Sequence, residues 1–143
     1  MKKWKISRSM SMILMMTLSV GCGKITETES DVKTTDIRFE AVSDSEYYNR
    51  EERGYYYVRE DGDILLTVQR GMQNTGGYGV SIESVVGNEK HIDVTVAEEN
   101  PEPGGIVTEA LTYPACTVRI FIDSEEISVH NANGDEYPYL SQK

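Results

Sequence analysis

The residue types that most often do chemistry in proteins are few in this 143-residue chain, and no spacing among them matches a known catalytic or metal site. Its two histidines, His91 and His130, have no second histidine or cysteine at the spacing of a zinc site. There is no Gly-x-Ser-x-Gly motif and no phosphate-binding loop. Three glutamate pairs, which in principle supply the two carboxylates of a glycosidase, stand in charged segments that we expect to be exposed: 51–52, 98–99 and 125–126. The sequence therefore predicts a protein that is not an enzyme and uses no metal or cofactor.

The N-terminus has the features of a secretory signal. Four of the first eight residues are basic, and they precede an apolar run of about 11 residues, which is too short to cross a bilayer. The following LSVGC resembles the lipobox of bacterial lipoproteins, although Ser19 stands where that motif usually has Leu. We therefore predict a signal peptide over 1–21, a lipidated Cys22 and a flexible tether over 22–36, with the protein anchored in the bacterial cell envelope and facing outside the cytoplasm. The alternative is an ordinary secretory signal with an incidental cysteine.

The net charge of the chain limits the kinds of partner that we expect, and its cysteine content limits the disulfides that it can form. Residues 1–21 contain four of the 14 basic residues and none of the 24 acidic ones, so the remaining chain has a formal charge of −14. So acidic a chain is not expected to bind nucleic acid or anionic lipid directly, and we expect its partner to offer a basic surface. With Cys22 lipidated, Cys116 has no intramolecular partner, and its apolar strand position predicts a small buried side chain rather than a nucleophile.

Short segments of alternating polarity predict one all-β domain over 55–143, an antiparallel β-sandwich of Ig-like or barrel-like form. A hairpin is expected between YYYV and ILLTVQR, with its turn at Asp61–Gly62. Residues 37–54 are assigned only as an arm, in which 37–42 can form a strand and 43–54 a short helix or an ordered segment. No segment has a helical apolar stripe. Further strands are expected in GYGVSIESVV, HIDVTVAE, ACTVRIFID and EISVH.

The sequence NTGGYG places two adjacent glycines directly before an alternating strand, although one glycine usually suffices for a turn. Two interpretations stay open: a tight hairpin in which the glycines serve only the fold, or a loop whose bare backbone a partner approaches. In either case Thr75 is expected to hold the turn by a bond from its hydroxyl to the backbone, and Tyr78 to begin the strand. The segment 98–105, rich in Pro and Gly, is expected to be a rigid, exposed loop.

Taken in order, GMQNTGGYGVSIESV and VTVAEENPEPGGIVTEALTYPACTVRI resemble the C-terminal domain of the protease complex subunit PrcB family, over roughly residues 55–123. Two positions depart from the family pattern: Asn74 stands where Pro is common, and Ala115 where another Tyr is common. The resemblance implies an envelope lipoprotein that binds and stabilises a secreted peptidase or peptidase complex without catalysing a reaction. Because glycines and prolines concentrate in connections between otherwise regular strands, we expect the segments 73–78, 100–105 and 111–114 to form or support the contact surface. The predicted partner-binding residues are Asn74, Thr75, Gly76, Gly77, Tyr78, Pro101, Pro103, Gly104, Tyr113 and Pro114.

Two further functions remain as alternatives. NTGGYG also resembles the Asn-Pro-Thr-Thr-Gly-Tyr loop of chagasin-type inhibitors of papain-like cysteine peptidases, which implies inhibition in place of stabilisation. A structural or small-ligand-binding envelope domain is the third possibility, since the chain has nine tyrosines that suit either a binding surface or a ligand pocket. Peptidase activity separates the first two, and a sizeable tyrosine-lined pocket would favour the third.

Overall fold

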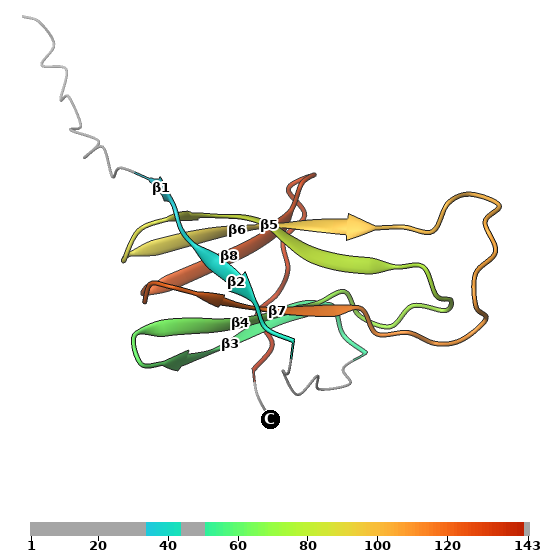
Figure 1. Cartoon of the computed structure of the whole chain (residues 1–143), viewed down its shortest axis with the longest axis horizontal. Helices are drawn as coiled ribbons and strands as arrows, with labels where there is room; N and C mark the ends of the chain where they lie inside the picture. The colour runs from blue at the N-terminus through green and yellow to red at the C-terminus, as the bar shows by residue number, and fades with distance from the viewer. Residues whose placement is uncertain (1–33, 44–50, 142–143) are drawn as a thin grey trace, which may run out of the picture. The chain divides into compact units, whose positions relative to one another are not determined.

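The computed structural model describes residues 34–43 and 51–141, which form two four-stranded sheets packed face to face (Figure 1). The described residues contain no helix, so the predicted all-β sandwich is confirmed. The strands are β1 (Thr35–Asp36), β2 (Phe39–Ala41), β3 (Gly54–Glu60), β4 (Asp63–Gln69), β5 (Gly79–Gly87), β6 (His91–Glu99), β7 (Ala115–Ile120) and β8 (Glu126–Asn131).

The strand order is β1-β5-β6-β8 in one sheet and β2-β7-β4-β3 in the other. The pairs are antiparallel except β6 with β8, which is parallel. The chain reverses twice between these strands, first into β7 of the other sheet and then back, so β8 runs in the direction of β6. Strands β1 and β2 are consecutive parts of one extended segment that passes from one sheet to the other at Ile37 and Arg38. Thr35 and Asp36 lie within the predicted tether and pair with the end of β5.

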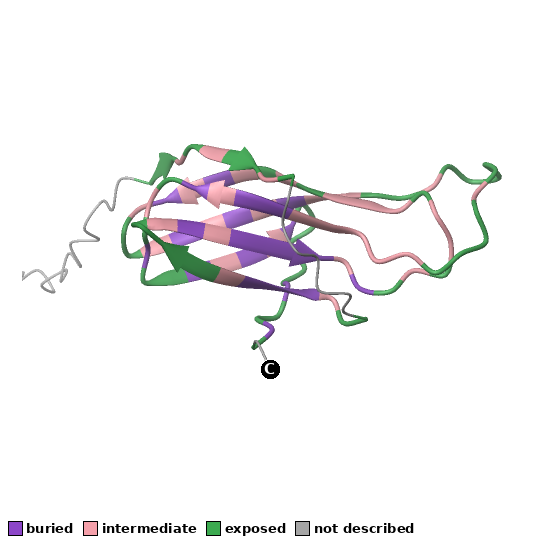
Figure 2. Ribbon diagram, turned by 60° about the horizontal axis from the view of Figure 1, so that its bottom comes forward, coloured by how far each residue is buried: buried purple, intermediate pink, exposed green. Residues whose placement is uncertain are grey.

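The alternation read from the sequence places one side-chain row of each central strand in the core. On β4 this row is Ile64, Leu66 and Val68, and on β6 it is Ile92, Val94 and Val96, all fully buried (Figure 2). Burying each such side chain contributes about 1.5–3 kcal/mol relative to leaving it in water. The core therefore lies between the inner faces of the two sheets.

The predicted hairpin forms between β3 and β4. Glu60 pairs with Asp63, and the two residues between them have positive φ, 53° at Asp61 and 87° at Gly62. This is the conformation of a type I′ turn, whose twist matches that of the flanking strands. The prediction of this turn is confirmed.

The chain after β8 closes the side of the sandwich between β8 and β3. The backbone N–H of Tyr137 donates to the Val129 carbonyl (2.8 Å), and that of Leu140 donates to the Tyr55 carbonyl (2.7 Å). Gly54 is buried against this C-terminal segment, where a Cβ would lie 2.5 Å from both Leu140 Cγ and the Pro138 carbonyl oxygen. The segment can pair with β3 only because Gly54 has no side chain. Residues 44–50, within the predicted arm, lie outside the described residues.

Replacing Gly54 by Ala should lower the free energy of unfolding by about 1–3 kcal/mol, because the added methyl group has no room beside Leu140 and Pro138. Urea denaturation followed by circular dichroism measures the change. Gly76→Ala is the control, since its Cβ would lie no closer than 3.6 Å to any neighbour, and we expect a change below about 1 kcal/mol. Equal effects of the two substitutions would contradict the role assigned to Gly54.

Candidate functional site

The structure brings the predicted partner-binding residues together at one end of the sandwich. Strands β4 and β6 end there and β5 and β7 begin there, so the connecting segments 71–78 and 100–114 lie side by side (Figure 1). We call these two segments the loop pair, and all ten predicted residues fall within it. Thr35 pairs with Gly87 at the opposite end of β5, so the chain enters the sandwich at the end away from the loop pair.

Hydrogen bonds join the two segments into one unit. Gln73 and Thr112 exchange two backbone bonds, of 2.8 and 2.9 Å. The N–H of Gly76 donates to the Thr108 carbonyl (2.9 Å), and the Thr112 hydroxyl donates to the Thr75 carbonyl (2.9 Å). The expected hydroxyl bond of Thr75 is thus replaced by a bond to its carbonyl oxygen. Neither segment moves independently of the other while these bonds last.

The adjacent glycines serve contacts within the chain. Gly77 has a φ of 87°, and a Cβ there would lie 2.9 Å from the Pro101 Cβ and 3.4 Å from Val107 Cγ1. Gly76 has an ordinary backbone conformation, and a Cβ there would make normal contact with Thr108 at 3.6 Å. The close approach that the sequence suggested at this backbone is therefore made by the neighbouring segment, and Gly77 is required by the fold of the loop pair.

The ten predicted partner-binding residues differ in their exposure to solvent. Asn74, Gly77, Pro103 and Gly104 are exposed, and Pro101 is half-buried. The peptide bond before Pro114 is trans, and the Pro114 carbonyl accepts from the Arg70 N–H at 2.8 Å. The half-buried residues that support the loop pair are Thr75, Gly76, Tyr78, Pro101, Tyr113 and Pro114.

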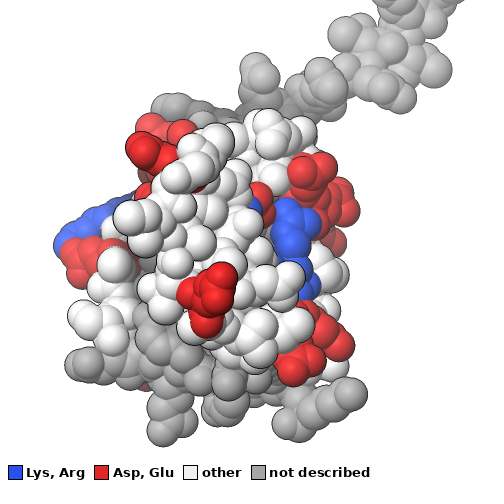
Figure 3. Space-filling model, turned by 90° about the vertical axis from the view of Figure 1, so that its right-hand side faces the viewer, with Lys and Arg blue, Asp and Glu red and all other residues white. Residues whose placement is uncertain are grey.

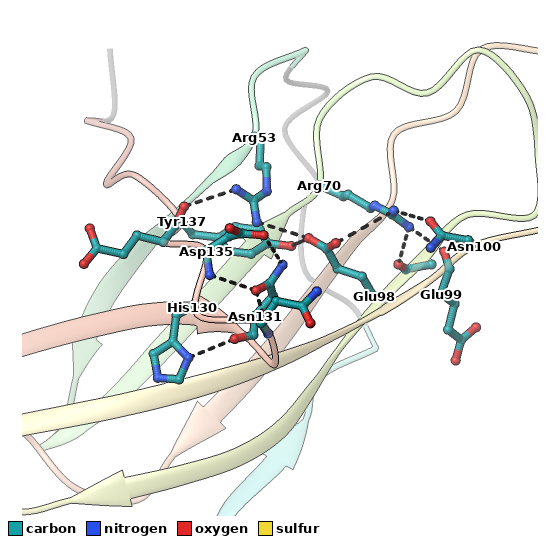
Figure 4. Close-up of polar contacts among 12 residues, drawn as sticks. Arg53, Arg70, Glu98, Glu99, Asn100, His130, Asn131, Asp135 and Tyr137 are labelled. Atoms are coloured by element: carbon teal, nitrogen blue, oxygen red, sulfur yellow. Dashed lines mark hydrogen bonds and ion pairs between the residues drawn. The ribbon is translucent and has the colours of Figure 1, made fainter.

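Arg70 holds the base of the loop pair. Its side chain is 11% exposed, and its guanidinium donates to the carbonyls of Gly79 (3.3 Å) and Glu99 and to the side chain of Asn100 (Figure 4). The same guanidinium lies 4.9 Å from the centre of the Tyr78 ring, within the range of a cation–π interaction. Arg70 thereby joins the end of β4 to the start of β5 and the end of β6, where both loop segments begin.

Glu98 is the centre of a polar cluster beside Arg70 (Figure 4). Its side chain is 21% exposed and accepts hydrogen bonds from the Tyr137 hydroxyl and from Arg53 Nη2 (3.2 Å), with Arg70 Nη2 at 3.8 Å. Arg53 also stacks 3.8 Å from the centre of the Tyr137 ring. Burial acts to raise the pKa of Glu98, but these hydrogen bonds and the two arginine charges outweigh it, and the pKa is lowered. The expectation that Glu98 stands in an exposed segment is wrong, because it is enclosed by these partners.

Arg70 and Glu98 were missed as structural residues, although the sequence contained a signal for both. On β4 the buried positions 64, 66 and 68 continue in phase to Arg70, and on β6 the positions 92, 94 and 96 continue to Glu98. Side chains two apart on a strand share a face, so both charges point inward. Opposite charges at inward positions of two strands that end together predict an ion pair.

Two other candidate reactive residues, His91 and Cys116, lie outside the loop pair. His91 contacts Asp93 (3.2 Å) and Glu126 (3.5 Å) on the surface of the sheet. Cys116 is half-buried, and burial raises the pKa of its thiol to about 11, so that it stays protonated at neutral pH. Within residues 34–43 and 51–141 no group of three His, Cys, Asp or Glu side chains is placed to bind a metal ion. The same residues include no helix with the length and hydropathy to cross a membrane. Cys22 lies outside them.

Replacing Tyr137 by Phe should remove a pH-dependent part of the stability. Burial, followed by the hydrogen bond to Glu98, raises the pKa of Tyr137 from 10.0 to about 12. Since the protonated phenol is favoured in the folded state, its contribution is complete below pH 10 and declines as pH rises to about 12. At neutral pH we expect Tyr137→Phe to cost about 1.5–3 kcal/mol, the value of a hydrogen bond to a charged group.

The measurement is chemical denaturation of wild type and Tyr137→Phe at several pH values between about 9 and 12. The difference in the free energy of unfolding should shrink across this range, because only the wild type has a phenol at this position. A difference that stays constant would contradict the role of the buried hydroxyl. Tyr139→Phe is the control, since Tyr139 is largely exposed.

Comparison with known proteins gave one family match for this part of the chain. Residues 64–120 match the family model described as PrcB C-terminal. This span runs from β4 to β7 and includes both segments of the loop pair together with Arg70 and Glu98. No curated protein and no solved structure gave a match. The part of the chain that forms the loop pair and the strands carrying it is therefore similar to the PrcB C-terminal domain family.

Proposed function

We propose that the protein is a non-catalytic subunit, anchored in the bacterial cell envelope through lipid on Cys22, that binds a secreted peptidase or peptidase complex and stabilises it. The observation that supports this most is the loop pair within the PrcB C-terminal domain: two segments cross-linked by hydrogen bonds, held at their base by Arg70 and exposed beyond it. A surface already held in one conformation loses little entropy on binding. The loop pair is therefore the proposed contact surface.

The chain joins the sandwich at the end that does not carry the loop pair. A tether between Cys22 and Thr34 can span at most about 40 Å. It would reach the sandwich at the β1 end, because Thr35 pairs with Gly87, and the loop pair lies at the other end. The point at which the chain joins the sandwich therefore does not occupy the loop pair.

Three cavities lined by residues that the structure describes give no support to the small-ligand alternative. The cavity lined by Tyr55 and Tyr137, beside β8, has a volume of about 240 Å³, below the range of about 300–1,000 Å³ that is usual for ligand sites. Two larger hollows on the described surface, of about 550 and 580 Å³, have no tyrosine in their lining. We therefore retain protein binding as the function and distinguish stabilisation from inhibition by experiment.

The test is an affinity capture. The full chain with a C-terminal affinity tag is expressed in cells, and the proteins bound to it are recovered from detergent-solubilised envelopes. In the test variant two exposed glutamates of the loop pair are reversed in charge, Glu102→Arg with Glu109→Arg. The matched control reverses two exposed glutamates at the opposite end of the sandwich, Glu89→Arg with Glu125→Arg. Gly77→Val is unsuitable, because its side chain would collide with Pro101 and disturb the loops themselves.

We expect wild type and control to recover a peptidase and the loop variant to recover at least about tenfold less, since a binding surface that meets acidic residues repels basic ones. A captured peptidase that keeps its activity and survives longer supports stabilisation, whereas lowered activity supports inhibition. Recovery of no peptidase by wild type, or equal recovery by all three proteins, would contradict the proposed function.

A further inference from the structure

The loop pair carries exposed hydrophobic side chains that the sequence patterns did not single out. Among the residues that the structure describes, six large hydrophobic side chains are exposed, and three of them lie in the loop pair. Ile106 is fully exposed at 105% relative to a reference residue, Leu111 is 58% exposed and Met72 is 41% exposed. Single exposed apolar residues are common on protein surfaces, but a concentration of them at one end of a domain marks an interaction site.

The fold places Ile106 outward by two local features. A turn precedes it, in which the N–H of Gly105 donates to the Glu102 carbonyl (2.9 Å) and Gly104 has a φ of 79°. Its neighbour Val107 packs toward Gly77, with Cγ1 3.4 Å from the position of a Cβ there. Val107 thus packs inward, and the adjacent Ile106 points outward.

Met72 and Leu111 lie beside the bridge that joins the two segments of the loop pair. Gln73 and Thr112 are directly opposite each other in an antiparallel bridge, and each of the two hydrophobic residues precedes one of them. Both hydrophobic residues are therefore adjacent in sequence to the cross-link between the two segments. Both are exposed, which extends the apolar surface beyond Ile106.

The charges of the loop pair indicate which kind of partner it fits. The loop pair contains no lysine or arginine, and its charged residues are Glu102 and Glu109. Viewed toward this end, the surface is mainly uncharged, with acidic side chains at its lower middle and at its edges and basic side chains at its sides (Figure 3). Insertion into an anionic membrane surface requires basic residues. A symmetric contact between two copies would bring these glutamates together. A protein with an apolar pocket bordered by basic residues fits both the hydrophobic and the acidic groups.

We propose that Ile106 is the anchor of the interaction, entering an apolar pocket of the partner peptidase whose border carries lysine or arginine. Met72 and Leu111 contact the apolar surface around that pocket, and Glu102 and Glu109 meet its basic border. This inference rests on the proposed function and adds to it the chemistry of the partner's binding site. Anchors of this type occupy desolvated pockets and account for most of the effect of substitutions in an interface.

The experiment places the photo-crosslinking residue benzoylphenylalanine at position 106 of the full chain, in cells that express the peptidase. The matched control places it at position 58, since Val58 is also an exposed aliphatic residue but lies on β3, outside the loop pair. Adducts are identified by mass spectrometry at residue level. We expect position 106 to give an adduct with the peptidase in an apolar pocket bordered by basic residues, and position 58 to give none.

In the same cells, Ile106→Asp should lower recovery of the peptidase by about 30-fold or more, Ile106→Val by less than about 5-fold, and Val58→Asp not at all. An adduct of position 106 with lipid or with a second copy of the chain would overturn the inference. So would a peptidase adduct formed from position 58 alone, an outcome that leaves the proposed function standing. No peptidase adduct from either position, together with no peptidase recovered by wild type, would overturn both.

Discussion

The arrangement of this domain depends on one constraint: a carboxylate that points into a partly buried region must be paired. Glu98 continues the inward face of β6, and its partners come from three separate parts of the chain, Arg53 before β3, Arg70 after β4 and Tyr137 beyond β8. Because the pairing requires all of them at one place, it fixes the ends of the two sheets relative to each other. Losing one partner would leave a buried charge without full compensation, which is far more costly than losing a surface ion pair.

The same constraint explains why the loop pair can serve as a binding surface. Arg70, which faces Glu98, also donates hydrogen bonds to the backbone where both loop segments begin. The same side chain therefore connects the Glu98 cluster with the base of the loop pair. Beyond that base, inward and outward positions have separate roles. Gly77 and Val107 pack the two segments together, while Ile106 is left in solvent. An exposed residue in a loop that hydrogen bonds already hold in place can bind a partner with little loss of conformational entropy.

Local patterns predicted the parts of the structure that depend on local physics. Strand alternation and the Asp61–Gly62 turn are encoded within a few residues, and both are confirmed. The parallel β6–β8 pair and the pairing of residues 138–140 with β3 depend on contacts between distant segments, which one sequence does not display. The loop residues were located by composition and family resemblance, but their cross-linking was not. Ile106 was missed because nothing in the sequence distinguishes two adjacent apolar residues. Only the structure shows that Val107 packs inward and that Ile106 is exposed.

The most direct test of the account is amide hydrogen exchange of the full chain with and without the captured peptidase. The bound peptidase should slow exchange in residues 71–78 and 100–114, beyond the protection that their existing hydrogen bonds give. The turn at 61–62 and the connection at 88–90, at the other end of the sandwich, should exchange at unchanged rates. Protection at those turns with the loop pair unaffected would contradict the claim that this end of the domain is the surface that binds.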